Sequence, residues 1–258
     1  MPLTFRACGI SETGLVREGN EDAWGELPEY QFYVLADGMG GHQAGEVASA
    51  ETVRILKDMM AEVLSERSQG RSPKDLGIML RLAIVETNRR VFKMAQEAPE
   101  LKGMGTTLCC IALHGYHLVY AHLGDSRIYR LRDGHLQQLT CDHSLYRQMI
   151  DRGQVDEGDP QLQSYKNIVT KCIGTGWLVD PTVAIDAVLP GDWIMMCSDG
   201  LTDMVSNQQI EHLMNDWPTP REACHALVEA ALMNGGVDNV TVVVAAIEEG
   251  ENADGDSS

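Results

Sequence analysis

The sequence predicts an α+β fold in which two antiparallel sheets carry helix pairs on their outer faces. Short runs rich in Val, Ile, Leu and Tyr end at Gly, Asp or Asn, as strands do. Two helical segments separate the second strand-like run from the third, and two more precede the last run. This order lacks the regular alternation of strand and helix that is typical of a doubly wound parallel sheet.

Eight segments have the composition of strands. Residues 116–132 also have the form of a hairpin, because Gly124-Asp125-Ser126 lies between two apolar runs, and a second turn follows at Asp133-Gly134. The predicted strands are Phe5–Ile10, Gln31–Ala36, Thr106–Leu113, His117–Leu123, Arg127–Arg132, Val183–Val188, Trp193–Cys197 and Val240–Ile247.

Four helices are predicted from apolar spacing and from capping signals. Apolar residues recur at helical spacing in residues 53–63 and again in 76–94. Ser72-Pro73 supplies an N-cap and a proline at the first position of the second helix. Ser206–Gln209 and Thr219–Glu222 both have the pattern of a capping box, and the last helix is expected to end at Gly235-Gly236.

The 258 residues are expected to form a single domain over residues 1–247, followed by an acidic, disordered tail at 248–258. The polar stretch Gly153–Lys166 interrupts the pattern of elements and is expected to form a flap or lid on the surface. Apolar residues make up 44% of the chain and charged residues 22%, which excludes disorder as the global state.

The net charge of −18 argues against two classes of partner. Binding to nucleic acid depends on clustered Lys and Arg, and so does binding to an anionic membrane surface. No apolar run reaches about 18 residues, and the N-terminus lacks a basic start before an apolar stretch, so neither a membrane span nor an export signal is predicted. Seven cysteines, with no C-x-x-C pair, indicate free thiols and a cytoplasmic location.

Acidic residues beside glycine adjoin several apolar strands. Any one such pair could simply form a turn, because Asp and Gly are both turn residues. Several such pairs indicate a site for divalent cations, since rigid strand ends can bring carboxylates together. Carboxylates with backbone carbonyls suit Mg²⁺ and Mn²⁺. The acidic positions are Asp37, Asp125, Asp199 and Asp238, with a fifth group at Glu21-Asp22 close to Arg17.

Seven short motifs follow one another along the chain: Arg17-x-x-Asn20-Glu21-Asp22, Asp37–His42, Gly105-Thr106-Thr107, Gly124–Arg127, Thr140-x-Asp142-His143-Ser144, Ser198–Asp203 and Asp238-Asn239-x-Thr241. In order and spacing they resemble the motifs of the metal-dependent serine/threonine phosphatases of type 2C, and most closely those of prokaryotic members. The resemblance runs from about Phe5 to Ile247. It implies a four-layer αββα sandwich with the metal ions in a cleft at one end of the sheets.

The resemblance also implies a set of metal ligands. Asp37 would bridge two tightly bound Mn²⁺ or Mg²⁺ ions, and the carbonyl oxygen of Gly38 would bind one of them. Asp199 and Asp238 would complete the shell of the other ion. These positions are all present in the chain.

Further positions would hold water, substrate or a third ion. By the same resemblance, Glu21 and Asp22 would bind coordinated waters, and Asp125 would help to hold a third, weaker ion. Arg17 would bind the substrate phosphate, and residues 153–166 would border the substrate cleft. The catalytic residues implied are Arg17, Asp37, Asp199 and Asp238.

The activity implied is that of a serine/threonine phosphoprotein phosphatase. Two ions would lower the pKa of a shared water, and this nucleophile would attack phosphorus in line without a phosphoenzyme. The partners would be phosphoserine and phosphothreonine proteins, the products of a bacterial Ser/Thr kinase. Because the chain is acidic overall, the metals and Arg17 would supply the local positive charge.

Two other functions fit parts of the sequence. Cys141 and Arg147 have the C-x₅-R spacing of cysteine-dependent phosphatases, although this loop carries Leu145 and Tyr146 where small residues are needed, and Asp142 would repel phosphate. A degenerate member of the type 2C family would bind phosphoproteins or a partner without turnover. Such a member would be expected to have lost metal ligands, which this chain retains.

Two positions depart from the family's pattern. Met39 stands where many eukaryotic relatives carry a His that is proposed to protonate the leaving group. His42, three residues further on, is equally well explained as a loop histidine. Lys171 stands where relatives often carry Arg, and no functional role is assigned to it.

Overall fold

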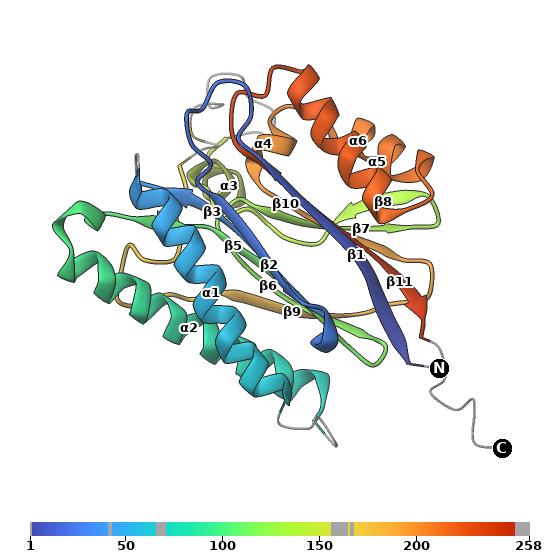
Figure 1. Cartoon of the computed structure of the whole chain (residues 1–258), viewed down its shortest axis with the longest axis horizontal. Coiled ribbons are helices and arrows are strands. Elements are labelled where there is room, and N and C mark those ends of the chain that lie inside the picture. Colours follow the sequence, from blue (N-terminus) through green and yellow to red (C-terminus); the bar gives the residue numbers. More distant parts are fainter. Residues whose placement is uncertain (1, 41–42, 66–70, 156–164, 166–167, 251–258) are drawn as a thin grey trace.

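The computed structural model describes residues 2–40, 43–65, 71–155, 165 and 168–250. Within these ranges two sheets pack against each other, and helices cover the outer face of each sheet (Figure 1). Every pairing between neighbouring strands is antiparallel. The four-layer αββα sandwich and the antiparallel sheets predicted from the sequence are therefore confirmed.

The first sheet joins strands from distant parts of the chain, in the order β1-β11-β10-β7-β8. Its bounds are β1 (Leu3–Glu12), β7 (Arg127–Arg132), β8 (His135–Gln138), β10 (Trp193–Cys197) and β11 (Val240–Glu249). The helices α4 (Asp199–Thr202), α5 (Asn207–Asp216) and α6 (Pro220–Met233) follow β10 in the chain, and α6 packs on β1 and β11. This helix layer lies on the outer face of the first sheet (Figure 1).

The second sheet has the order β2-β3-β5-β6-β9, with β4 also paired to β3. The strands are β2 (Asp22–Leu27), β3 (Phe32–Met39), β4 (Gly105–Thr106), β5 (Leu108–His114), β6 (His117–Leu123) and β9 (Thr182–Ala187). Its outer face is covered by α1 (Gln43–Ser65) and α2 (Pro73–Glu97), the two long helices expected there. The remaining elements are α3 (Leu145–Asp151) and two single 3₁₀ turns, Pro28–Tyr30 and Pro99–Leu101.

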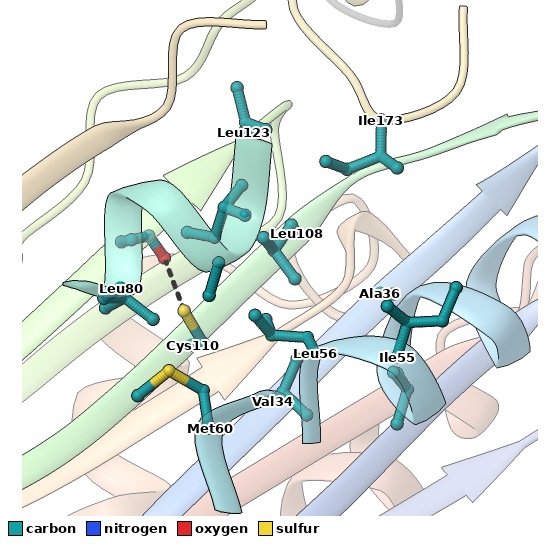
Figure 2. Packing of buried hydrophobic residues seen from close by; sticks show 14 of the residues in the cluster. Val34, Ala36, Ile55, Leu56, Met60, Leu80, Leu108, Cys110, Leu123 and Ile173 are labelled. Carbon is teal, nitrogen blue, oxygen red and sulfur yellow. Dashed lines mark hydrogen bonds between the residues drawn. The ribbon is translucent and has the colours of Figure 1, made fainter. Parts of the chain in front are cut away.

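The apolar core has three layers that match the alternation of side chains along the strands. Alternate residues of β1 and β3 meet between the two sheets, where Phe5 and Tyr33 pack edge to face with ring centroids 5.7 Å apart. The other residues of β3 and β5 face α1 and α2. Figure 2 shows this second layer, in which Leu56 of α1 lies among Val34 and Leu108.

The predicted helix starts are largely confirmed. Ser72 and Ser206 each form a complete capping box with the residue three positions later. Thr219 accepts a bond from the amide of Glu222, but its own hydroxyl donates to the Glu222 carboxylate at 2.6 Å. The Glu222 side chain therefore bonds to the cap's hydroxyl, so only half of the box predicted at this position is seen.

Several element boundaries differ from the sequence-based expectation. β3 continues through Asp37-Gly38 to Met39, because β2 and β4 supply partners for these residues. The predicted strand Thr106–Leu113 is divided at Thr107, whose amide donates to the carbonyl oxygen of Asp37 at 2.8 Å. The short strand β2 and the helix α3 were not predicted, since neither has a clear apolar period.

The C-terminal boundary also differs. β11 continues to Glu249, and Glu248 forms an ion pair with Arg6 at 2.7 Å, so the first two residues of the predicted tail belong to the sheet. Residues 251–258 lie outside the described residues, as does most of the predicted flap, namely residues 156–164 and 166. Among the helices that are described, none combines the length and apolar character needed to cross a bilayer.

The packing around α1 makes a stability prediction. Leu56 is 0% exposed, so Leu56→Ala is expected to lower the free energy of unfolding by about 2–5 kcal/mol, because it removes apolar contacts and leaves a cavity. Leu82→Ala on α2 is the matched control, since this leucine is 62% exposed. Urea denaturation of both variants measures the difference, and equal losses would contradict the packing described.

Candidate active site

The register between β2 and β3 brings two of the predicted site residues together. Asp22 lies directly opposite Asp37 in this antiparallel pair. Directly opposed residues project from the same face of a sheet, with their Cβ atoms about 4.5–5.5 Å apart. The pairing of two strands therefore places two carboxylates side by side.

Two hydroxyl groups hold the Asp22 carboxylate, one from β11 and one from the residue between β10 and α4. Oδ2 of Asp22 accepts hydrogen bonds from Ser198 Oγ at 2.8 Å and from Thr241 Oγ1 at 2.7 Å. Oδ1 of the same group is buried without a hydrogen-bond partner. Burial raises the pKa of Asp22 to about 6, although the two hydroxyl groups act in the opposite direction.

The backbone at Asp37-Gly38 is fixed from two sides. The amide of Asp37 donates to Thr107 Oγ1 at 3.0 Å, and its carbonyl oxygen accepts from Thr106 Oγ1 at 2.8 Å. A Cβ atom at Gly38 would lie 2.2 Å from the carbonyl oxygen of Gly45 in α1, so only glycine fits where β3 passes under the helix. Burial, followed by the charges of Asp22 and Asp199, raises the pKa of Asp37 well above its ordinary value.

A second group of carboxylates surrounds the start of α4. Burial raises the pKa of Asp199 to about 8, and the charges of Asp125 and Asp203 add to the effect. Burial also raises the pKa of Asp125 to about 6. All three aspartates line one cavity of about 540 Å³. Asp203 was not assigned a role from the sequence, although its spacing of four residues from Asp199 could have indicated it.

Arg17 and Asp238 form an ion pair across the site. Arg17 Nη2 lies 2.7 Å from Asp238 Oδ2, and the Arg17 side chain is 52% exposed. The hydrogen bond to Asp238 raises the pKa of Arg17 despite partial burial. Arg17, which is predicted to bind phosphate, thus contacts Asp238, a predicted metal ligand. The sequence did not indicate this contact.

Asn239 anchors the loop that carries Arg17, and the sequence analysis gave it no role. Its Nδ2 donates to the carbonyl oxygens of Thr13 and Gly19, both at 2.9 Å, and its Oδ1 accepts from the amide of Glu21 at 2.8 Å. One side chain therefore fixes both ends of the segment around Arg17. The place of Asn239 beside Asp238 in the last motif could have indicated that it belongs to the site.

The other predicted positions fall into separate places. The Glu21 carboxylate lies against the first turn of α1, where a Cβ atom on Gly45 would be 2.6 Å from its Oε2. Met39 pairs with Gly105 at the end of β3. Lys171 Nζ forms an ion pair with Asp180 at 3.3 Å, which is a structural contact. His42 lies outside the described residues.

The C-x₅-R segment does not form a phosphate-binding loop. The amides that would have to converge on a phosphate donate elsewhere: His143 to the carbonyl oxygen of Gly124, Leu145 to that of Ile168 and Arg147 to Ser144 Oγ. Arg147 itself lies in α3, and its Nη2 is 2.9 Å from Asp151. These contacts argue against Cys141 as the nucleophile of a cysteine-dependent phosphatase.

The donor set fits hard divalent cations. Carboxylates crowd together here, four of them with raised pKa values, and the buried Oδ1 of Asp22 has no hydrogen-bond partner. Oxygen donors of this kind suit Mg²⁺ and Mn²⁺, whose charge would offset the repulsion. Within the part of the chain that the structure describes, no three acidic, His or Cys side chains already form a complete cation site. The Asp238 carboxylate forms an ion pair with Arg17 in this arrangement.

The fold and this cluster define a class: a four-layer αββα protein with acidic side chains converging from both sheets. Residues 16–233 match the family model described as protein phosphatase 2C. The chain is 38% identical over 243 residues to the serine/threonine protein phosphatase PstP of Mycobacterium tuberculosis, covering 94% of this chain and 45% of that protein. It is 34% identical over 237 residues to the serine/threonine phosphatase stp of Listeria monocytogenes, covering 91% and 92%.

A solved structure agrees with these sequence matches. The catalytic domain of PstP in complex with two manganese ions superposes with a TM-score of 0.82 at 36% identity, covering 96% of this chain and 100% of that one. The chain therefore belongs to the protein phosphatase 2C family. It spans about half the length of the PstP protein and nearly all of the Listeria relative.

Two stacked imidazoles lie beside the turn that carries Asp125, and one of them bonds to the amide of Gly124. The rings of His122 and His143 are 4.4 Å apart and nearly parallel. Nδ1 of His143 accepts from the amide of Gly124 at 3.3 Å, so its Nε2 carries the proton and donates to Thr182 Oγ1 at 3.0 Å. Burial, then the neighbouring His122 and Lys171, lowers the pKa of His143 to about 3, against a small opposite effect of Asp180.

This environment predicts a pH dependence of stability. The unfolded imidazole titrates near pH 6.5 and the folded one near 3, so the unfolded state binds more protons between these values. The stability from neutral His143 is present above pH 6.5 and is lost as the pH falls toward 3. In urea denaturation between pH 7 and 4.5, the free energy of unfolding of His143→Gln should fall less steeply with decreasing pH than that of the wild type. His135 is exposed, so His135→Gln should show the same pH dependence as the wild type. The same pH dependence in His143→Gln would contradict the assignment.

Proposed function

We propose that this chain is a serine/threonine phosphoprotein phosphatase that works with Mn²⁺ or Mg²⁺. The observation that carries the proposal is the convergence of Asp22, Asp37, Asp199 and Asp238, since the charge of Asp238 adds to the burial that raises the pKa values of the other three. Membership of the protein phosphatase 2C family supports the reaction class. The two manganese ions in the PstP structure support the choice of metal.

The proposed ligands are those that the family resemblance implies. Asp37, the carbonyl oxygen of Gly38, Asp199 and Asp238 would hold the two tightly bound ions. Glu21 and Asp22 would hold coordinated waters. Asp125 would bind a third, weaker ion, and the cavity that it shares with Asp199 and Asp203 adds Asp203 to this set. When bound, the ions would supply the charge that activates a water molecule for direct attack on phosphorus, without a phosphoenzyme.

The chain's own residues would position the reactants. The guanidinium of Arg17 is half exposed and would exchange Asp238 for a phosphate oxygen. Carboxylate and phosphate oxygens both accept charge-assisted hydrogen bonds from a guanidinium. Asn239 keeps the Arg17 loop in place during this exchange. Ser198 and Thr241 hold Asp22 in one orientation, which would keep a water-binding oxygen directed into the site.

The proposed partners are phosphoserine and phosphothreonine proteins, supplied by a bacterial Ser/Thr kinase, and the proposed location is the cytoplasm. Relatives named as Ser/Thr phosphatases support the first part. The seven free cysteines support a reducing compartment. The retained carboxylate cluster favours turnover over a binding-only function.

The decisive test separates metal chemistry from thiol chemistry. Phosphate release from a phosphothreonine peptide should be abolished by EDTA and restored by Mn²⁺. Asp37→Asn should abolish release and weaken Mn²⁺ binding in calorimetry, while its circular dichroism stays like that of the wild type. Cys141→Ser is the control and should retain activity, because its hydroxyl fits the same exposed site. Chelator-resistant activity that is lost in Cys141→Ser would overturn the proposal.

The assignment of Arg17 has its own test. Arg17→Ala should raise KM for the phosphopeptide about 10- to 150-fold, the equivalent of about 1.5–3 kcal/mol for one charge-assisted contact. Its affinity for Mn²⁺ should not weaken, because Arg17 competes for Asp238 rather than binding the ion. Arg6→Ala is a close control: this arginine also forms a 2.7 Å ion pair and is 50% exposed. Equal kinetics for the two variants would show that Arg17 is a surface ion-pair residue.

A further inference from the structure

Two cysteines from opposite ends of the chain meet on the outer face of the first sheet. Side chains of β1 alternate between the two faces: Phe5 and Ala7 point toward the second sheet, whereas Cys8 and Ile10 point toward the helix layer. Cys224 lies in the first half of α6, which packs on β1. Cys8 and Cys224 therefore belong to the same apolar cluster.

The contact between these residues involves the sulfur atoms themselves. Cys224 Sγ donates to the carbonyl oxygen of Cys8 at 3.1 Å, across 216 positions of sequence. The Cys224 thiol therefore lies directly against Cys8. The adjacent Cys109 and Cys110 differ in this respect, because they point to opposite faces of β5 and into different clusters.

The two thiols differ in accessibility and acidity. Cys8 is half-buried, whereas Cys224 is buried. The neighbouring Cys224 thiol, opposed by burial and aided by the charge of Arg221, lowers the pKa of Cys8 to about 7. The neighbouring Cys8 thiol, together with burial, raises the pKa of Cys224. The more accessible sulfur is therefore also the more acidic one, and so the better nucleophile of the pair.

We propose that Cys8 and Cys224 form a peroxide-sensitive dithiol that closes to a disulfide between β1 and α6. In the first step the Cys8 thiolate attacks a peroxide oxygen: the O–O bond breaks, Cys8 becomes a sulfenic acid, and hydroxide leaves. In the second step the Cys224 sulfur attacks the Cys8 sulfur, the S–O bond breaks, and the Cys224 proton leaves with the hydroxyl group as water. Two electrons pass from the thiol pair to the peroxide, and a dithiol reductant returns them.

This oxidation is independent of the phosphatase assignment, because neither sulfur contacts a proposed ligand or Arg17. It nevertheless joins the two elements that lead into the site. β1 runs into the Arg17 loop, and α6 runs into the Gly235–Asp238 segment, where the amide of Leu15 donates to the carbonyl oxygen of Gly236 at 2.7 Å. The disulfide would lock together the supports of the Arg17–Asp238 pair.

The test treats the reduced full chain with equimolar hydrogen peroxide at pH 7, followed by alkylation and peptide mass mapping. We expect a Cys8–Cys224 peptide pair, lighter by two hydrogen atoms and reversed by dithiothreitol. Cys8→Ser should give no such pair. Cys224→Ser should stop at the first step, so that dimedone labels Cys8.

Two controls keep the test decisive. Cys141→Ser removes an exposed thiol and should leave the Cys8–Cys224 pair unchanged. Cys224→Ala replaces Cys224→Ser if the hydroxyl disturbs the apolar cluster, as judged by circular dichroism. The proposal is overturned if Cys141 is oxidised while Cys8 stays reduced, or if wild-type Cys8 is oxidised without forming the link to Cys224.

Discussion

Repulsion between neighbouring carboxylates is the constraint on which the rest of this structure depends. The site requires several acidic side chains in one small volume, and burial makes their charges harder to stabilise. Such an arrangement cannot rest on flexible loops alone, because the charges would move apart. Its supports are the sheet register that sets Asp22 opposite Asp37, and the hydroxyl groups of Ser198 and Thr241 that cross from the other sheet.

The same constraint explains the small and polar residues around the site. Glycine at position 38 lets β3 pass within contact of α1, and glycine at position 200 lets α4 lie against the carbonyl oxygen of Asn239. Thr107 bonds to both the backbone of Asp37 and the hydroxyl of Ser126, so it connects the two groups of carboxylates. These residues bring backbones close together without adding charge to a volume that is already strongly acidic.

Much of this organisation was predictable from the sequence. Apolar runs and helical spacing gave both sheets and the long helices, and Asp-Gly pairs marked strands whose carboxylates converge. The pairing of Arg17 with Asp238 was not predictable, because it joins positions 221 apart through side-chain geometry. Asn239 was recognised as part of the last motif, but its role was not predictable, because its bonds to the backbone of distant residues leave no pattern in the sequence. Strand β2 was missed since its six residues mix polar, aromatic and glycine positions, and its identity comes from its partner β3.

The pairing of β1 with β11 has a consequence for synthesis. These strands match over ten residue pairs, from Leu3–Glu249 to Glu12–Val240, so β1 leaves the ribosome well before the strand that it bonds to. In the finished sheet β1 is an edge strand with β11 as its only neighbour, so a nascent chain lacking β11 would leave both edges of β1 without a partner, the kind of surface to which other strands add. Asp238, Asn239 and Thr241 emerge at the same late moment. Completion of the first sheet and completion of the carboxylate cluster are therefore one event, and a chain truncated before residue 238 would have neither.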